Sequence, residues 1–127
     1  METQRISWYL SKILFYLGFS PKVVGYKYIK EIIFAYIDYG TIKMNEMYGI
    51  ISRNHNQTPE LIAASVRNAL KRANNNYLNK RLEDLMGARL FDKNYNITVG
   101  EFFGLITTYL KYCWDGVSLD LPNTIYS

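Results

Sequence analysis

Residues 54–73 have the sequence NHNQTPELIAASVRNALKRA, the most informative segment of the chain. It opens with four polar residues at 54–57, which suit a tight turn. Thr58, Pro59 and Glu60 then form the strongest helix start in the chain, because they supply a hydroxyl cap, a first-turn proline and an acid near the positive helix end. The pattern predicts a helix that begins at Thr58 and ends at about Ala73.

A second helix is predicted immediately before that turn, over about Met44 to Arg53. Helix, four-residue turn and helix together form the layout of a helix-turn-helix, whose second helix enters the DNA major groove. At about 100° per residue, the second helix buries an apolar face made of Ile62, Val66, Ala69, Leu70 and Ala73. Its predicted solvent face consists of Glu60, Ala64, Arg67, Asn68, Lys71 and Asn75, with Arg72 at the edge. Small Ser52 and Ser65 are expected to let the two helices cross closely.

Helical spacing continues on both sides of this motif. Further helices are predicted over about 6–17, 21–39 with Ser20 as its cap, 77–86, and 98–113. Thr98 and Glu101 have the spacing of a capping box, and residues 88–97 are expected to form a loop or a short hairpin. The sequence therefore predicts an all-α fold, a compact bundle of about six helices, with a helix-turn-helix domain at 1–113 and an irregular tail at 114–127.

Composition excludes several other classes of protein. The chain has 127 residues, 49% hydrophobic and 20% charged, which is the balance of one folded domain. Every uncharged stretch is far shorter than the roughly 20 residues that span a bilayer, so we expect no membrane helix. The amino terminus lacks the order of a secretory signal, which makes the cytoplasm the expected compartment. A single cysteine, Cys113, and a single histidine, His55, are too few for a disulfide or a zinc site, and we expect both to be packing residues.

The positive charge of the chain is concentrated around the motif. Residues 53–81 carry six basic residues and one acid, a net charge of +5, whereas the whole chain has a net charge of +4. Such a concentration is what a polyanion site needs, although a solvated helix face would explain it equally well. No metal, nucleophile or phosphate-loop arrangement is present in the sequence, so we expect neither an enzyme nor a cofactor.

Four segments together resemble a known family. They are residues 11–18, the string GYKYIKE at 25–31, residues 56–69, and Leu85-Met86-Gly87 with 98–102. Over about residues 11–113 the chain resembles the carboxy-terminal effector domain of stage-zero sporulation protein A, the response regulator that starts spore formation. The resemblance implies about six helices, major-groove binding through helix 58–73, side-by-side homodimers on DNA and no cofactor. About ten residues precede the match, so we expect no receiver domain in this sequence.

The chain also departs from that family. The family's recognition helix is polar and basic where this chain has Leu61, Ala63 and Ala64, while Arg67 and Asn68 retain the pattern. We therefore expect a changed DNA target or weak binding. Exposed Leu61 would contact either a thymine methyl group or a protein partner.

The leading hypothesis is a sequence-selective, double-stranded DNA-binding transcription regulator. Arg67 and Asn68 would contact bases next to Ala64, and Gln57 and Thr58 would anchor the helix amino terminus. The predicted phosphate contacts are Lys71, Arg72, Lys80 and Arg81. The alternative is a protein-interaction module of the same fold, which would place Leu61, Ala63 and Ala64 against a partner such as a full-length sporulation regulator protein, with weak or no DNA binding.

Overall fold

Helices dominate the computed structural model, which describes residues 2–40, 42–73 and 77–112. In chain order the described helices are α1 (Glu2–Leu17), α2 (Gly25–Tyr39), α3 (Met44–His55), α4 (Pro59–Ala73), α5 (Tyr77–Met86) and α6 (Val99–Tyr112). The described residues contain no strand, so residues 88–97 form a loop rather than a hairpin. The prediction of an all-α fold with six helices is confirmed.

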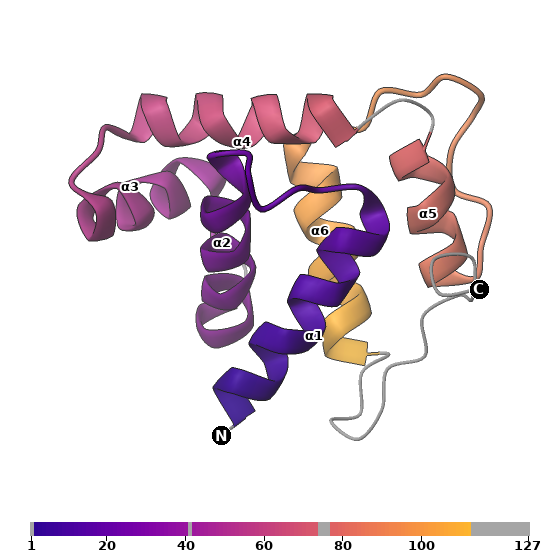
Figure 1. Ribbon diagram of the computed structural model, residues 1–127, viewed down its shortest axis with the longest axis horizontal. Helices are drawn as coiled ribbons and strands as arrows, with labels where there is room; N and C mark the ends of the chain where they lie inside the picture. Colours follow the sequence, from indigo (N-terminus) through magenta and orange to yellow (C-terminus); the bar gives the residue numbers. More distant parts are fainter. Residues whose placement is uncertain (1, 41, 74–76, 113–127) are drawn as a thin grey trace.

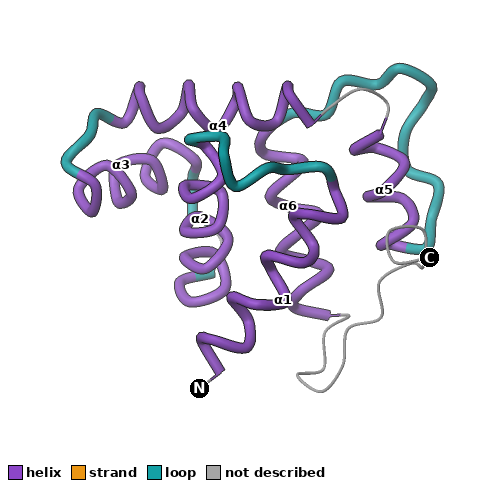
Figure 2. The backbone as a smooth tube through the Cα atoms, in the orientation of Figure 1, coloured by secondary structure: helices purple, strands orange, loops and turns teal. Residues whose placement is uncertain are grey.

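Helix α4 lies across one end of the molecule, at the top of Figure 1, and the other helices lie beneath it. It contacts α2, α3 and α6, and α3 runs below its amino-terminal half (Figures 1 and 2). Helix α5 lies at the right of Figure 1, on the opposite side of the molecule from α3, where it contacts α1 and α6. None of the described helices covers the outer side of α4.

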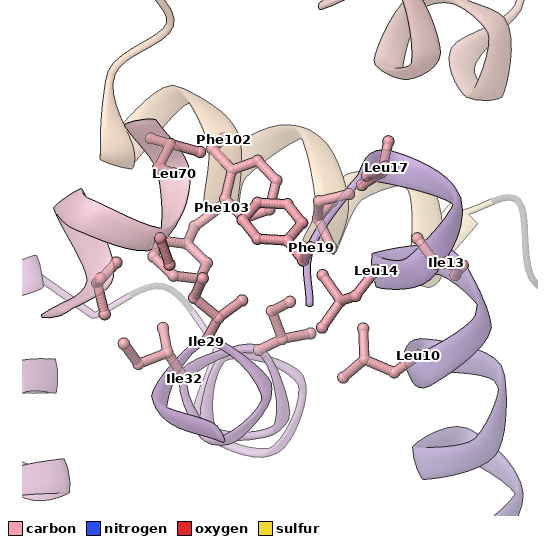
Figure 3. Packing of buried hydrophobic residues seen from close by; sticks show 14 of the residues in the cluster. Leu10, Ile13, Leu14, Leu17, Phe19, Ile29, Ile32, Leu70, Phe102 and Phe103 are labelled. Carbon is pink, nitrogen blue, oxygen red and sulfur yellow. The ribbon is translucent and has the colours of Figure 1, made fainter. Parts of the chain in front are cut away.

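The core is formed where α1, α2, α4 and α6 meet (Figure 3). Leu14 from α1 and Ile29 from α2 are fully buried there beside Phe102 and Phe103 of α6. The ring centroid of Phe19 lies 5.3 Å from that of Phe102, within the range of favourable aromatic pairs. This apolar core holds α1, α2 and α6 together, and α4 packs against α2 and α6.

Two predicted helix starts are wrong. Helix α2 begins at Gly25 rather than at Pro21, because residues 20–23 close into a turn in which the Val23 N–H donates to the Ser20 carbonyl over 3.0 Å. The Ser20 hydroxyl accepts the Lys22 N–H over 3.2 Å within this turn, so it does not cap α2. Helix α1 begins at Glu2, four residues before the predicted start at 6.

The turn of the helix-turn-helix is shorter than predicted. Helix α3 continues to His55, and Asn56 then takes the left-handed conformation with φ 53°, which asparagine tolerates better than most residues. The backbone N–H groups of Asn56 and Gln57 both donate to the Ser52 carbonyl. The polar residues Asn54 and His55 thus belong to the last helical turn, where sequence alone suggested a loop.

Some predictions fall on residues that the structure does not describe. These are Asn75, Cys113, and the tail at 114–127. Within the described ranges, no helix is both long and apolar enough to span a bilayer. The same ranges contain no cluster of histidine, cysteine and carboxylate side chains suited to a metal ion.

Candidate nucleic-acid interface

The amino terminus of α4 is capped as predicted. The Thr58 hydroxyl accepts the N–H of Leu61 over 3.1 Å, and the Thr58 carbonyl accepts that of Ile62 over 3.2 Å. Pro59 occupies the first helical position, where its missing N–H costs nothing. Gln57 and Thr58 are both exposed, so the start of α4 is open to solvent.

The inner face of α4 is buried against the other helices. All five residues predicted for it are buried, namely Ile62, Val66, Ala69, Leu70 and Ala73. The backbone of α4 also approaches α2 very closely, because a Cβ atom placed on Gly25 would lie 2.2 Å from the Ser65 carbonyl oxygen. The Ser65 carbonyl therefore lies at the crossing of α4 with α2, and it is Gly25 that allows this close approach.

The outer face of α4 is exposed along its described length. Its exposed members are Glu60, Leu61, Ala64, Arg67, Asn68, Lys71 and Arg72, and Asn75 lies outside the described residues. Arg67 and Asn68 stand next to each other in the middle of the helix. The guanidinium and amide groups that the sequence selected are thus directed away from the core.

Two grooves flank this exposed face. The first, here called the turn-side groove, is formed between α4 and the turn before α2 and is lined by Lys22, Val23, Val24, Gly25, Leu61, Ala64, Ser65, Asn68 and Arg72. The second, the α6-side groove, is formed between α4 and the start of α6 and is lined by Arg67, Leu70, Lys71, Asn96, Ile97, Thr98 and Val99. Arg67 and Asn68, adjacent in sequence, therefore line opposite grooves. The exposed ridge of α4 lies between the two grooves.

The start of α6 is held by the predicted capping box. The Thr98 N–H donates to Glu101 Oε1 over 2.9 Å, and the Glu101 N–H donates to the Thr98 hydroxyl over 3.1 Å. The Tyr95 hydroxyl also donates to the Glu101 carboxylate. These bonds hold the pKa of Glu101 below its ordinary value, with the Tyr95 contact the largest cause. The wall of the α6-side groove is thereby fixed by local hydrogen bonds.

Tyr48 was not among the predicted site residues. It lies half-buried on α3, and its pKa lies above the ordinary value because burial outweighs the opposing effect of the nearby Arg67 charge. The Arg67 charge thus acts on the Tyr48 phenol across the helix-turn-helix. The position of Tyr48 on the first helix of the motif was the only signal in the sequence, and spacing alone does not relate it to Arg67.

The two predicted phosphate contacts on α5 differ in environment. Lys80 is exposed. The Arg81 guanidinium is half-buried and lies over two rings, 4.5 Å from the Tyr16 centroid and 4.3 Å from the Tyr77 centroid. It also donates a hydrogen bond to the Tyr77 hydroxyl. Arg81 thus takes part in packing α5 against α1, a role that the sequence did not predict.

His55 has the packing role expected for it. Its Nε2 atom lies 2.6 Å from Glu31 Oε2, and its ring meets the Tyr28 ring edge-on at a centroid distance of 5.0 Å. Both partners belong to α2. His55 therefore links the end of α3 to α2, and this contact helps to hold the first helix of the helix-turn-helix in place.

A helical domain that exposes arginine, lysine and amide groups on the second helix of a helix-turn-helix has the layout of a DNA-binding regulatory domain. Residues 10–110 match the sequence profile of the family described as "Sporulation initiation factor Spo0A C terminal". The chain belongs to this family of sporulation regulators, which confirms the resemblance noted in the sequence. No curated protein and no solved structure gives a significant match to the chain.

Proposed function

We propose that the chain binds double-stranded DNA sequence-selectively, as a transcription regulator of the sporulation type, by placing α4 in the major groove. One observation carries this proposal. The apolar face of α4 is buried, while its basic and amide side chains are exposed between two grooves. An α-helix fits the major groove, and these side chains are the types that pair with base edges and phosphates.

The position of each side chain suggests its role. Arg67 and Asn68, in the middle of the exposed ridge, are suited to guanine and adenine edges respectively, and Ala64 allows a close approach of the helix to the bases. Lys71 and Arg72 follow one turn later and would neutralise phosphates. Gln57 and Thr58 would bind a phosphate at the open amino terminus of α4. Exposed Lys80 is the better phosphate contact on α5, because Arg81 is already engaged with two aromatic rings.

Further parts of the proposal concern assembly and location. Two copies would bind side by side on DNA as a homodimer, as the family resemblance implies. A DNA-binding regulator of this family would act in the cytoplasm, without a cofactor.

Salt dependence of duplex binding tests the proposal. Six basic residues lie between 53 and 81, so the logarithm of the binding constant should fall against the logarithm of salt concentration with a slope of about −3 to −6 per protomer. Fluorescence anisotropy with a labelled duplex measures this slope. A slope near zero would contradict the proposal.

Two substitutions test the assigned roles. Arg67→Ala should flatten the preference among duplex sequences, whereas Lys71→Ala should weaken binding to all of them alike. Lys111→Ala removes the same charge near the other end of α6, about 20 Å along that helix from the α6-side groove, and should leave binding unchanged. Equal effects of the first two substitutions on preference would refute the division of roles.

A second candidate function is a protein-interaction module of the same fold. It is favoured by Leu61, which keeps 45% of its surface exposed on a face that otherwise carries polar and charged groups and the small Ala64. A gel shift with random duplex at low salt and a pull-down with a purified full-length sporulation regulator separate the two functions. The DNA-binding proposal requires that the protein shifts the duplex in the gel. The interaction module requires a positive pull-down and no shift of the duplex.

A further inference from the structure

The turn-side groove contains an apolar patch in the middle of an otherwise polar surface. Val24 from the turn before α2 is 60% exposed, and Leu61 from α4 is 45% exposed. Both line the groove together with exposed Ala64. Water-exposed aliphatic groups gain free energy when a ligand covers them with its own apolar surface, so the patch is suited to an apolar group.

Backbone packing builds this patch from two separate segments. Gly25 lies against the Ser65 backbone of α4 with no room for a side chain, which brings the turn at 22–25 up to the helix. Val24, next to Gly25 in the chain, is thereby held beside α4. The patch is therefore a fixed part of the fold and depends on the α2–α4 crossing.

The rim of the groove is cationic. Lys22 stands on the side of the turn and Arg72 on the side of α4, and the amide of Asn68 lies between the patch and Arg72 along the helix. No carboxylate lines this groove among the described residues. A complementary ligand carries negative charge on its outside and small apolar groups within reach of the floor.

Duplex DNA has both properties. Its backbones are anionic, and the apolar group that it displays in the major groove is the C5 methyl of thymine. Leu61, Ala64 and Asn68 follow one edge of α4 over about 10 Å, the length of about three base-pair steps. Ala64 would thus meet a methyl group about two steps, and Leu61 one about three steps, from the base that Asn68 contacts.

We propose that the turn-side groove recognises thymine methyl groups through Val24, Leu61 and Ala64 and so selects thymine at one or two positions of the target. This inference rests on the proposed DNA-binding function and specifies its ligand.

Replacement of thymine by deoxyuridine tests the inference, because it removes the methyl group and leaves base pairing intact. A duplex selected from a random pool is prepared with each thymine replaced in turn, and anisotropy at fixed salt gives the dissociation constants. Covering one methyl group changes affinity about fourfold, which corresponds to about 0.8 kcal/mol. We expect that loss at one or two positions and no change at the others.

Variants assign the effect to the patch. Leu61→Asn should bind the thymine and deoxyuridine duplexes equally at the position that Leu61 contacts, since its contact with that methyl group is lost. Leu90→Asn is a matched control, because Leu90 has a similar exposed fraction of 43% and does not line the turn-side groove. It should keep the fourfold discrimination. Both positions are exposed, and thermal melting checks that each variant is folded.

The remaining outcomes separate this inference from the function on which it rests. Equal affinity of the unaltered protein for both duplexes, with the salt dependence intact, would overturn methyl recognition and leave DNA binding standing. Absence of duplex binding at any salt concentration would overturn both. A Leu61→Asn variant that keeps full discrimination but no longer binds a full-length sporulation regulator would show that the patch docks a protein, and would overturn the inference.

Discussion

Gly25→Ala should destabilise the domain even though alanine is the better helix former. The added Cβ would lie 2.2 Å from the Ser65 carbonyl oxygen and 2.8 Å from the Ala69 Cβ. Carbon–oxygen contacts in proteins are about 3.3 Å or longer, so the backbones of α2 and α4 must separate by about 1 Å. A backbone carbonyl cannot rotate away as a flexible side chain can.

The magnitude follows from two opposing effects. Overpacking of this kind costs about 3 kcal/mol, and the helix propensity of alanine returns about 1 kcal/mol. The net loss of about 2 kcal/mol corresponds to a fall in Tm of roughly 8 °C for a domain of this size. Because Gly25 also lines the turn-side groove, DNA affinity should decrease as well.

Thermal and urea unfolding followed by circular dichroism measure this loss, with Gly104→Ala as the control. Gly104 lies within α6, and a Cβ there would meet no atom within 4 Å. Gly104→Ala should therefore raise stability by about 0.5 to 1 kcal/mol. A Gly25→Ala protein with unchanged or higher Tm would refute the close crossing of α2 and α4.

Three further predictions concern single interactions. Thr98→Ala removes the hydroxyl that caps α6 and should lower the free energy of unfolding by about 1 kcal/mol in urea titrations; no loss would contradict the capping box. Hydrogen bonds from the Phe91 and Leu90 N–H groups hold the pKa of Glu83 below its ordinary value, so its contribution is present above the unfolded pKa and lost as pH falls through the folded one. Thermal melts from pH 6 down to about pH 3 should show this loss in the parent and less of it in Glu83→Gln, and parallel curves would count against it. Arg81→Met should cost about 0.5 to 2 kcal/mol through its contacts with two rings, whereas Lys80→Met should stay within about 0.5 kcal/mol, and equal costs would remove the packing role of Arg81.

Local and periodic features were predictable from the sequence. The Thr58 cap, the buried face of α4 and the Thr98 capping box each depend on residues within a few positions of one another, and each is present in the structure. The string at 25–31, together with the helix-turn-helix that follows it, indicated the family, and the family match covers both. For these features, chain order and helical period suffice.

Features that join distant segments were not predictable in the same way. The turn-side groove needs the backbone of Gly25 against Ser65, 40 positions later, and the sequence suggested instead a helix start at Pro21. Arg81 was predicted to be a phosphate contact, and its position over the Tyr16 ring depends on how α5 packs against α1. Only the packing of whole helices decides which exposed residues become neighbours.

Backbone amide chemical shifts of the isotope-labelled chain, recorded while a duplex from the selected pool is titrated in, test most directly whether α4 enters the major groove. We expect the largest changes within residues 57–72, with a second group at 22–25 and a third at 96–99. Changes concentrated on the outer sides of α1 and α5, with α4 unaffected, would contradict this placement of the DNA.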